Sequence, residues 1–275
     1  MLVSLNLSVI SEEIKFIIFT NSCNSSFLLI TFKCILDKIN LYTKDYLLKN
    51  KIIYYQYKNG YRTGIEPIIL ASKISPNANR ILDIGCGCGS ISLILAYRNK
   101  YSYIYGWDKN IDFLTLANKS KFDNNFNNLI FENINIRDKK KTYLDFFDVI
   151  VTNPPFFLEN SVLQSKNKLL RDARYTSLEE LNEWFKNMLD YLKNNGKAFM
   201  INRYNNKDLL MSILKNYNVN IKIQPIKSYA DSDPKNIIME IEKSDNFSSE
   251  TISSLIVHNR DNNDGYSEYM KEWMI

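Results

Sequence analysis

The feature that most limits what this chain can fold into is a short apolar run that ends in three alternating glycines. Residues 80–84 (Arg-Ile-Leu-Asp-Ile) have the composition of a buried strand, Gly85, Gly87 and Gly89 follow, and residues 91–97 have the apolar spacing of a helix. Glycine is needed where a backbone turns tightly and must let a ligand approach without a Cβ in the way. This order predicts the first strand, turn and helix of a nucleotide-binding α/β sheet.

The next predicted strand, residues 101–107, ends in Asp108, a little over 20 residues beyond the first glycine. An acidic residue at that distance accepts the ribose hydroxyls in Rossmann-like units. The glycines follow the pattern Gly-x-Gly-x-Gly and not the dinucleotide pattern Gly-x-Gly-x-x-Gly. The ligand is therefore expected to be a nucleoside without a pyrophosphate.

A second constrained stretch begins with residues 147–151, an apolar run typical of a buried strand, and continues into Asn153-Pro154-Pro155-Phe156. The two prolines stop the strand, because they have no N–H for a sheet and hold φ near −65°. The resulting loop offers the Asn153 side-chain oxygen and a proline carbonyl as acceptors beside the flat ring of Phe156. Read alone, Asn-Pro-Pro is equally a plain turn, but such a loop suits a planar ring that carries an amine.

Two other stretches are candidates for ligand contacts. Arg62 and Thr63 stand between Gly60 and Gly64, just before a helix with Pro67 in its first turn, where they either begin that helix or close over a ligand. Residues 159–176 are too long for an idle connection, and their cations Lys166, Lys168, Arg171 and Arg174 indicate a substrate-side loop. A capping box at 177–180 predicts a helix that closes near Gly196, with Trp184 in the core.

The amino-acid composition excludes several kinds of catalytic and metal site. His258 is the single histidine, which largely excludes imidazole bases and histidine-ligated metals, and the Cys86-x-Cys88 pair has no matching second pair, so no metal is expected. A net charge of +5 fits a polyanionic partner without deciding it. Residues 1–40 contain no apolar run of the roughly 20 residues that a membrane span needs. We expect a cytoplasmic protein with an extension of unclear role at 1–40 and one domain at 41–275.

The residues 60–64, 83–89 and 153–157, in this order, resemble the class I S-adenosylmethionine-dependent methyltransferases that modify exocyclic amines, and most closely the bacterial tRNA1(Val) adenine-37 N6-methyltransferases. The resemblance covers about 41 to the C-terminus. It implies an α/β Rossmann-like fold with a seven-stranded, mostly parallel sheet, helices on both faces and one antiparallel strand. It also implies S-adenosylmethionine as cofactor and tRNA as partner, and we expect a monomer.

The resemblance further implies roles for single residues. The cofactor residues are expected to be Arg62, Thr63, Asp83, Gly85, Gly87, Asp108, Asn135 and Asp138; Asn153, Pro154, Pro155 and Phe156 are expected to hold the target amine, and Lys168, Arg171 and Arg174 the substrate. The chain departs from the family pattern twice. Asn135 stands where an aspartate is usual, with Asp138 nearby to serve the adenine amine, and Phe156 replaces the commoner tyrosine.

The function that this resemblance implies is methyl transfer to the N6 amine of an adenine, with a tRNA anticodon loop as the substrate. The sequence leaves two alternatives open. Glutamine methyltransferases that act on release factors carry the same Asn-Pro-Pro motif, usually with a separate N-terminal helical domain, and an RNA-binding module without catalysis would keep the fold. DNA adenine methyltransferases would normally add a recognition domain, which this sequence does not show.

Overall fold

The computed structural model describes residues 41–60, 62–154, 157–158, 175–262 and 265–274. Contacts divide the chain into two compact units, Met1–Thr43 and Lys44–Ile275. The predicted extension at 1–40 lies outside the described residues, so its boundary and its role stay predictions. Among the described residues, no helix combines the length and the apolar character that crossing a membrane requires. The expected cytoplasmic location and monomeric state are likewise still predictions.

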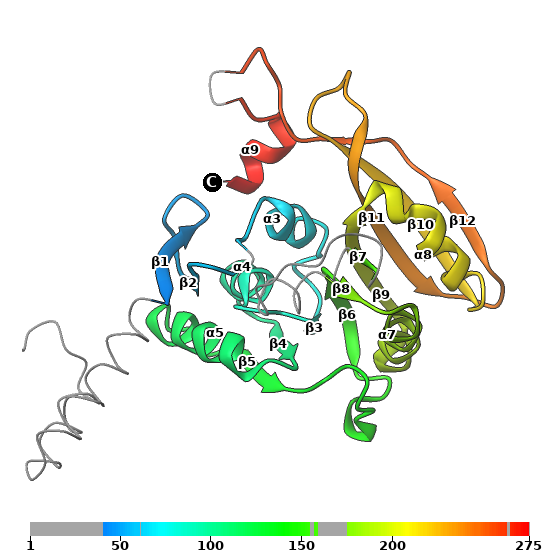
Figure 1. The fold of residues 1–275 in the computed structure, drawn as a ribbon, viewed down its shortest axis with the longest axis horizontal. Helices are drawn as coiled ribbons and strands as arrows, with labels where there is room; N and C mark the ends of the chain where they lie inside the picture. The colour runs from blue at the N-terminus through cyan, green and yellow to red at the C-terminus, as the bar shows by residue number, and fades with distance from the viewer. Residues whose placement is uncertain (1–40, 61, 155–156, 159–174, 263–264, 275) are drawn as a thin grey trace, which may run out of the picture. The chain divides into compact units, whose positions relative to one another are not determined.

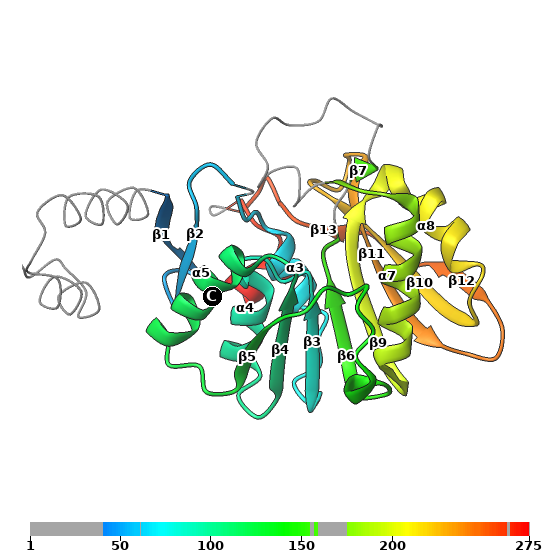
Figure 2. The same cartoon turned by 60° about the horizontal axis from the view of Figure 1, so that its bottom comes forward.

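The central sheet is built from alternating strands and helices. Its parallel strands are β3 (Arg80–Ile84), β4 (Tyr103–Asp108), β5 (Leu129–Asn133), β6 (Phe147–Thr152) and β9 (Leu192–Arg203), connected through α4 (Ser90–Arg98), α5 (Ile111–Asp123), the 3-10 turn η2 (Lys141–Tyr143) and α7 (Leu178–Tyr191). Figure 2 shows β3, β4, β6 and β9 side by side. Because parallel strands end at one edge of a sheet, the residues that follow β3, β4 and β6 all meet there.

The antiparallel strand is β11 (Pro234–Lys243), which lies between β9 and β10 (Val219–Lys227). The 3-10 turn η3 (Tyr204–Asn206) and α8 (Lys207–Leu214) connect β9 to β10. The strand order β10-β11-β9-β6-β3-β4-β5 is the predicted seven-stranded sheet with one antiparallel strand. Two short strands, β12 (Ser248–Thr251) and β13 (Leu255–Ile256), add to the outer side of β10.

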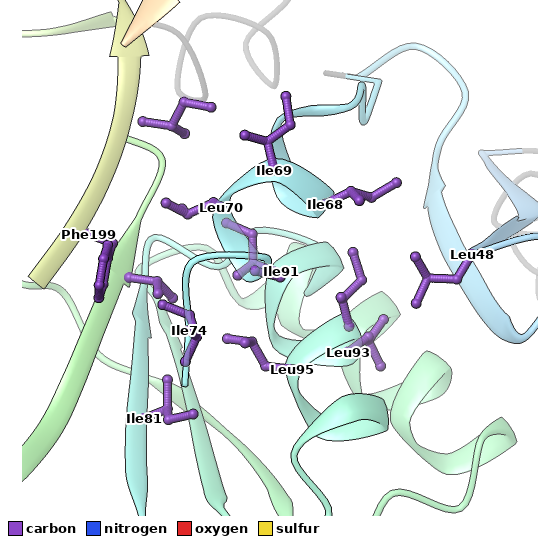
Figure 3. Packing of buried hydrophobic residues seen from close by; sticks show 14 of the residues in the cluster. Leu48, Ile68, Ile69, Leu70, Ile74, Ile81, Ile91, Leu93, Leu95 and Phe199 are labelled. Carbon is purple, nitrogen blue, oxygen red and sulfur yellow. The ribbon is translucent and has the colours of Figure 1, made fainter. Parts of the chain in front are cut away.

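Two apolar clusters cover the two faces of the sheet. The strand period of two sends Ile81 and Val149 to one face and Leu82 and Ile150 to the other. The first cluster is completed by α3 (Glu66–Ala71), α4 and the short C-terminal helix α9 (Glu268–Met274), and Figure 3 shows its aliphatic side chains interlocking. The second is completed by α7 and α8. Figure 1 shows the two groups of helices on opposite sides of the sheet.

Smaller elements flank the sheet. β1 (Tyr42–Leu47) and β2 (Ile52–Tyr57) form a two-stranded sheet, and β7 (Phe157–Leu158) pairs with β8 (Tyr175–Thr176) at the two ends of the undescribed segment 159–174. α3 has its proline in the first turn, as predicted.

The prediction that the helix opened at Ser177 closes near Gly196 is wrong. The helix ends at Tyr191 because Leu192 already pairs with Phe147 of β6 and begins strand β9. Gly196 lies inside that strand, where a Cβ would stand 2.9 Å from the carbonyl oxygen of Asp148. The glycine therefore permits a close approach of two strands and does not cap a helix.

Candidate active site at the carboxyl edge of the sheet

The glycine turn after β3 is held by the neighbouring strand. The amides of Gly85 and Cys86 both donate to the carbonyl oxygen of Trp107 on β4, at 2.8 and 3.0 Å. Gly85 and Gly87 have φ values of +71° and +55°, a conformation that side chains disfavour. A Cβ added to Gly87 would meet no atom within 4 Å. The turn is thus fixed by the sheet and leaves open space above Gly87.

Asp83 lies beneath this turn with its side chain fully buried. Its Oδ2 accepts hydrogen bonds from the Ser92 amide at 3.1 Å and the Ser92 hydroxyl at 2.6 Å, while its Oδ1 has no partner. Burial raises the pKa of Asp83 to about 7, although the Ser92 hydrogen bonds lower it. A buried carboxyl oxygen without a donor is well placed to accept one from a bound cation or amine.

Asp108 ends β4 beside the same turn. Its Oδ2 accepts from the Gly87 amide and its Oδ1 from the Asn110 amide, both at 2.8 Å. Burial raises the pKa of Asp108, and these two N–H groups counteract the shift. The carboxylate therefore braces the glycine turn from the position where the ribose hydroxyls are expected, and each oxygen keeps a second lone pair for a ligand.

The predicted cofactor residues Arg62 and Thr63 do not belong to β3 or β4, and each contacts a residue of β1 or β2. Arg62 pairs with Asp45 at 3.1 Å, and the Thr63 hydroxyl lies 2.8 Å from the Tyr54 hydroxyl, which ties both residues to β1 and β2. Neither contact requires or excludes a ligand, so their predicted roles stay predictions.

Asn135 and Asp138 follow β5 in a turn. The Asn135 Oδ1 accepts from the Arg137 amide at 3.1 Å, and the Asp138 amide donates to the Asn135 carbonyl at 2.9 Å. The Asp138 side chain is exposed. Asn135 therefore shapes the turn with its side chain, and the assignment of either residue to the cofactor adenine is still untested.

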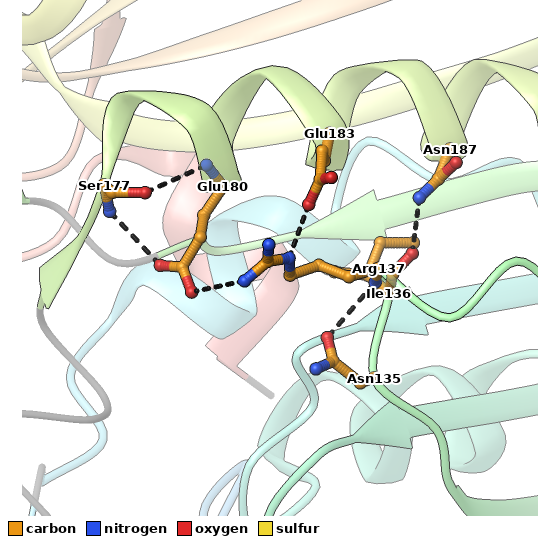
Figure 4. Close-up of polar contacts among 7 residues, drawn as sticks. All are labelled: Asn135, Ile136, Arg137, Ser177, Glu180, Glu183 and Asn187. Carbon is orange, nitrogen blue, oxygen red and sulfur yellow. Dashed lines mark hydrogen bonds and ion pairs between the residues drawn. The ribbon is translucent and has the colours of Figure 1, made fainter.

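The same turn is fastened to α7. Arg137 forms ion pairs with Glu180 at 3.3 Å and with Glu183, and the Asn187 amide donates to the Ile136 carbonyl at 2.7 Å (Figure 4). The predicted capping box is present, with Ser177 and Glu180 bonded to each other's backbone amides. These contacts fix where the first turns of α7 stand.

The predicted amine clamp begins directly at the end of β6. Thr152 pairs with Ile84, and its hydroxyl donates to the Ile84 carbonyl at 2.9 Å, which sets Asn153 beside Gly85 at the edge of the sheet. Asn153 is half-buried and its Oδ1 is fully buried without a hydrogen-bond partner. Pro154 is buried. Pro155, Phe156, Lys168, Arg171 and Arg174 lie outside the described residues.

Trp184 is a site residue that the sequence did not indicate. It packs against the second core cluster as predicted, but its Nε1 is buried without a partner, and its ring lies against Gly85. The amphipathic pattern of α7 assigns Trp184 to the core and contains no signal for a ligand. Only the packing of α7 on the glycine turn brings this indole to the site.

The residues present fit a nucleoside with a charged amine. Gly87 leaves room above the turn, the Asp108 carboxylate stands beside it, and the unpartnered Asp83 Oδ1 waits for a donor. These acceptors suit a sulfonium nucleoside with an amino-acid ammonium group, and they need no metal. In the described ranges, no three His, Cys, Asp or Glu side chains are grouped as metal ligands.

Comparison with known proteins assigns the family. A methyltransferase domain model matches residues 76–246. The release factor glutamine methyltransferase of Buchnera aphidicola is 31% identical over 58% of this chain and 57% of that protein. The tRNA1(Val) (adenine(37)-N6)-methyltransferase of Mannheimia succiniciproducens is 30% identical over 54% of this chain and 61% of that protein. This chain thus spans about three fifths of the length of each of these relatives.

A solved structure supports the fold. The crystal structure described as a predicted O-methyltransferase from Agrobacterium tumefaciens superposes with a TM-score of 0.60, at 15% identity, over 76% of this chain and 94% of that chain. The family model alone covers more than half of the 275 residues. The chain therefore belongs to the methyltransferase domain family, and its cofactor is S-adenosylmethionine.

Proposed function

We propose that the protein transfers the methyl group of S-adenosylmethionine to the exocyclic N6 amine of an adenine in the anticodon loop of a tRNA. The observation that carries this proposal is the Asn153 side-chain oxygen, which is buried and unpartnered beside the glycine turn. A buried acceptor of this kind costs free energy unless a ligand donates to it. An amine that faces the cofactor is such a donor.

The chemistry follows from what Asn153 does to that amine. The lone pair of an adenine N6 is delocalised into the ring, so the nitrogen is a weak nucleophile. A hydrogen bond from the amine to the Asn153 Oδ1, with a second to the Pro154 carbonyl, localises the lone pair and holds the nitrogen in line with the methyl group. S-adenosylmethionine supplies the electrophilic methyl group when bound. No strong base is needed, because the amine proton becomes acidic only after the methyl group is transferred.

Charge at the same edge supports a nucleic acid as substrate. Lys109 follows β4, Arg203 ends β9 and Lys227 ends β10, so three strands present cations where they approach the site. Phosphates that flank an extruded base would be attracted to this edge. The bases of an anticodon loop are unpaired and so easier to extrude, whereas a duplex would resist extrusion by a few kcal/mol. Lys168 and Arg171, which were predicted to contact the substrate, are consistent with this proposal, but they lie outside the described residues.

The second candidate is transfer to the side-chain amide of a glutamine in a release factor. A relative with that printed activity matches this chain as well as the tRNA methyltransferase does. A carboxamide also offers an NH₂ group to Asn153, so the clamp serves both substrates.

One assay separates these two functions. Purified protein is incubated with S-adenosylmethionine carrying a labelled methyl group and either unmodified tRNA or a release factor, and the products are digested and identified by mass spectrometry. We expect N6-methyladenosine from the tRNA and no methylglutamine from the release factor. Label that enters the release factor alone would refute the adenine proposal, and label that enters neither would favour the non-catalytic RNA-binding module.

A further inference from the structure

Three buried polar atoms without hydrogen-bond partners surround one glycine. They are the Oδ1 of Asp83, the Oδ1 of Asn153 and the Nε1 of Trp184. Within the described part of the chain only one other buried side-chain nitrogen or oxygen lacks a partner, the Nε of Arg98 at the last turn of α4. Asp83 and Asn153 are accounted for by the cofactor and the target amine. Trp184 is left with a donor that nothing in the proposed chemistry uses.

The six-membered ring of the Trp184 indole lies at the glycine turn. A Cβ built on Gly85 would lie 2.9 Å from the Trp184 Cη2 and 3.2 Å from its Cζ2. The nitrogen Nε1 is separated from Cζ2 by one ring atom, Cε2, and lies more than 4 Å from this Cβ position. Gly85 in turn stands beside Asn153, because Ile84 and Thr152 are paired in the sheet. The Trp184 ring, which carries the donor, and Asn153, which carries the acceptor, therefore both adjoin the same turn.

Trp184 is held in this place by α7. The Ser177 and Glu180 capping box begins the helix, the Arg137 pairs fasten its first turns, and the buried neighbours Leu181 and Phe185 anchor it to the core. The Trp184 ring is thus fixed before any ligand arrives. A rigid donor without an acceptor lowers the cost of binding a group that brings one.

We propose that the Trp184 N–H reads the ring nitrogen next to the target amine, N1 or N7 of the adenine. This inference rests on the proposed function and deepens it. An acceptor at Asn153 and a donor at Trp184 match a planar edge on which an NH₂ group adjoins a nitrogen lone pair. Both nitrogens that flank the N6 group of adenine have such a lone pair. Trp184 is accordingly a specificity residue for the base, in addition to the amine clamp.

The test combines one substitution with two altered bases. Trp184→Phe keeps the ring against Gly85 and removes the N–H, while 1-deazaadenosine and 7-deazaadenosine at the target position of an anticodon stem-loop RNA remove N1 or N7. We expect Trp184→Phe to lower kcat/KM about tenfold on adenosine, the size of one hydrogen bond to a neutral group. On the analogue that lacks the contacted nitrogen, the kcat/KM of the wild type is already about tenfold lower, and Trp184→Phe lowers it by less than a further factor of about three. The affinity for S-adenosylmethionine, measured by calorimetry, stays within about threefold.

The matched control is Trp273→Phe, since Trp273 packs against Arg98 on another part of the domain. We expect its kcat/KM on each of the three RNAs to equal that of the wild type. An equal loss by Trp184→Phe on all three RNAs would overturn the inference, because Trp184 would then act through Asn153 or the fold. A tenfold weaker cofactor affinity would also overturn it, by assigning the N–H to S-adenosylmethionine. If Trp184→Phe does not fold, equal wild-type kcat/KM on the three RNAs overturns the inference by itself.

These results are distinct from a failure of the proposed function. A wild-type protein that methylates a release factor and no RNA removes the adenine proposal and the Trp184 contact with it. A wild-type protein that methylates the RNA while Trp184→Phe is unaffected removes only the inference about Trp184.

Discussion

The cofactor side and the substrate side of the site differ in how their polar atoms are satisfied. On the cofactor side, Asp108 accepts from Gly87 and Asn110, and the turn amides of Gly85 and Cys86 are bonded to Trp107. On the substrate side, the buried atoms of Asn153 and Trp184 have no partner. The sheet bonds most of the first side and leaves the Asp83 Oδ1 to a ligand, whereas both of these atoms on the second side are left to what binds there. Changes on the first side should therefore affect cofactor affinity, and changes on the second should affect turnover.

The largest effect is expected from Asn153→Ala. Because the Asn153 Oδ1 has no partner in the protein, its removal costs the fold little and deprives the reacting amine of its acceptor. We expect kcat to fall about a hundredfold or more, the loss typical of a positioned polar group, with the affinity for S-adenosylmethionine nearly unchanged. Single-turnover rates and calorimetry measure the two quantities.

Asn182→Ala is the matched control for Asn153→Ala, because the Asn182 amide bonds only to the Leu178 carbonyl within α7. It should leave both kcat and cofactor affinity near the wild-type values. A collapse of cofactor affinity in Asn153→Ala would show that the two sides are one structural unit.

Gly87→Ala tests whether the cofactor occupies the open space above Gly87. No atom of the protein lies where the new methyl group would stand, so any steric conflict arises with the cofactor. We expect the affinity for S-adenosylmethionine to fall about fivefold to 150-fold, which corresponds to the 1–3 kcal/mol range of an overpacked contact. Calorimetry gives the affinity and thermal unfolding the stability.

Gly265→Ala provides the control for backbone strain. Gly265 has φ +70° and also meets no atom within 4 Å, so the alanine carries the same strain of about 1–2 kcal/mol away from the site. Both variants should lose similar stability, and only Gly87→Ala should lose affinity. Equal cofactor affinity in the two variants would mean that the space above Gly87 is not used.

Asp108→Ala is expected to weaken S-adenosylmethionine binding about tenfold or more. Charge-assisted hydrogen bonds to the ribose contribute about 1.5–3 kcal/mol, and the variant also releases the Gly87 amide. Asp112→Ala removes the same charge from an exposed position nearby and should leave binding intact. Unchanged affinity in Asp108→Ala would remove this residue from the cofactor site.

The smallest effect concerns pH. Burial raises the pKa of Asp83 from 3.8 to about 7, so the free protein holds Asp83 largely protonated below that pH. A cofactor ammonium group needs the ionised form, and its affinity should therefore rise several-fold, roughly tenfold at most, between pH 6 and pH 8. Binding near pH 6 should release a proton, which calorimetry in buffers of different ionisation enthalpy detects. Asp83→Asn should bind with no such pH dependence.

The contribution of Asp83 to the free energy of unfolding changes with pH in the opposite direction to that of an ion-paired aspartate. Because the folded pKa of Asp83 lies above the unfolded value, the folded state holds the extra proton between about pH 4 and pH 7. The contribution of Asp83 to the free energy of unfolding is therefore most favourable below pH 4 and is lost as the pH rises through 7. A stability of the wild type relative to Asp83→Asn that does not change over this window would contradict the assigned pKa.

The sequence by itself determined the order of strands and helices, the glycine turn and the end of β6 before Asn153-Pro154. Those features depend on local properties: glycine where φ is positive, proline where a strand must stop, and a near-continuous apolar run where a strand is buried on both faces. The seven-stranded sheet, the capping box at Ser177 and the positions of Asp83, Asp108 and Asn153 at the carboxyl ends of strands follow from them.

Tertiary structure decided what local pattern does not encode. Gly196 reads as a helix end, but pairing of Leu192 with Phe147 extends β9 through it. Trp184 reads as a core residue, but the packing of α7 on the glycine turn places its ring against Gly85 and leaves its buried N–H without a partner. Asp83 reads as an ordinary acid, but full burial under α4 raises its pKa to about 7. Each outcome depends on contacts between residues far apart in the chain, whose energies no single segment contains.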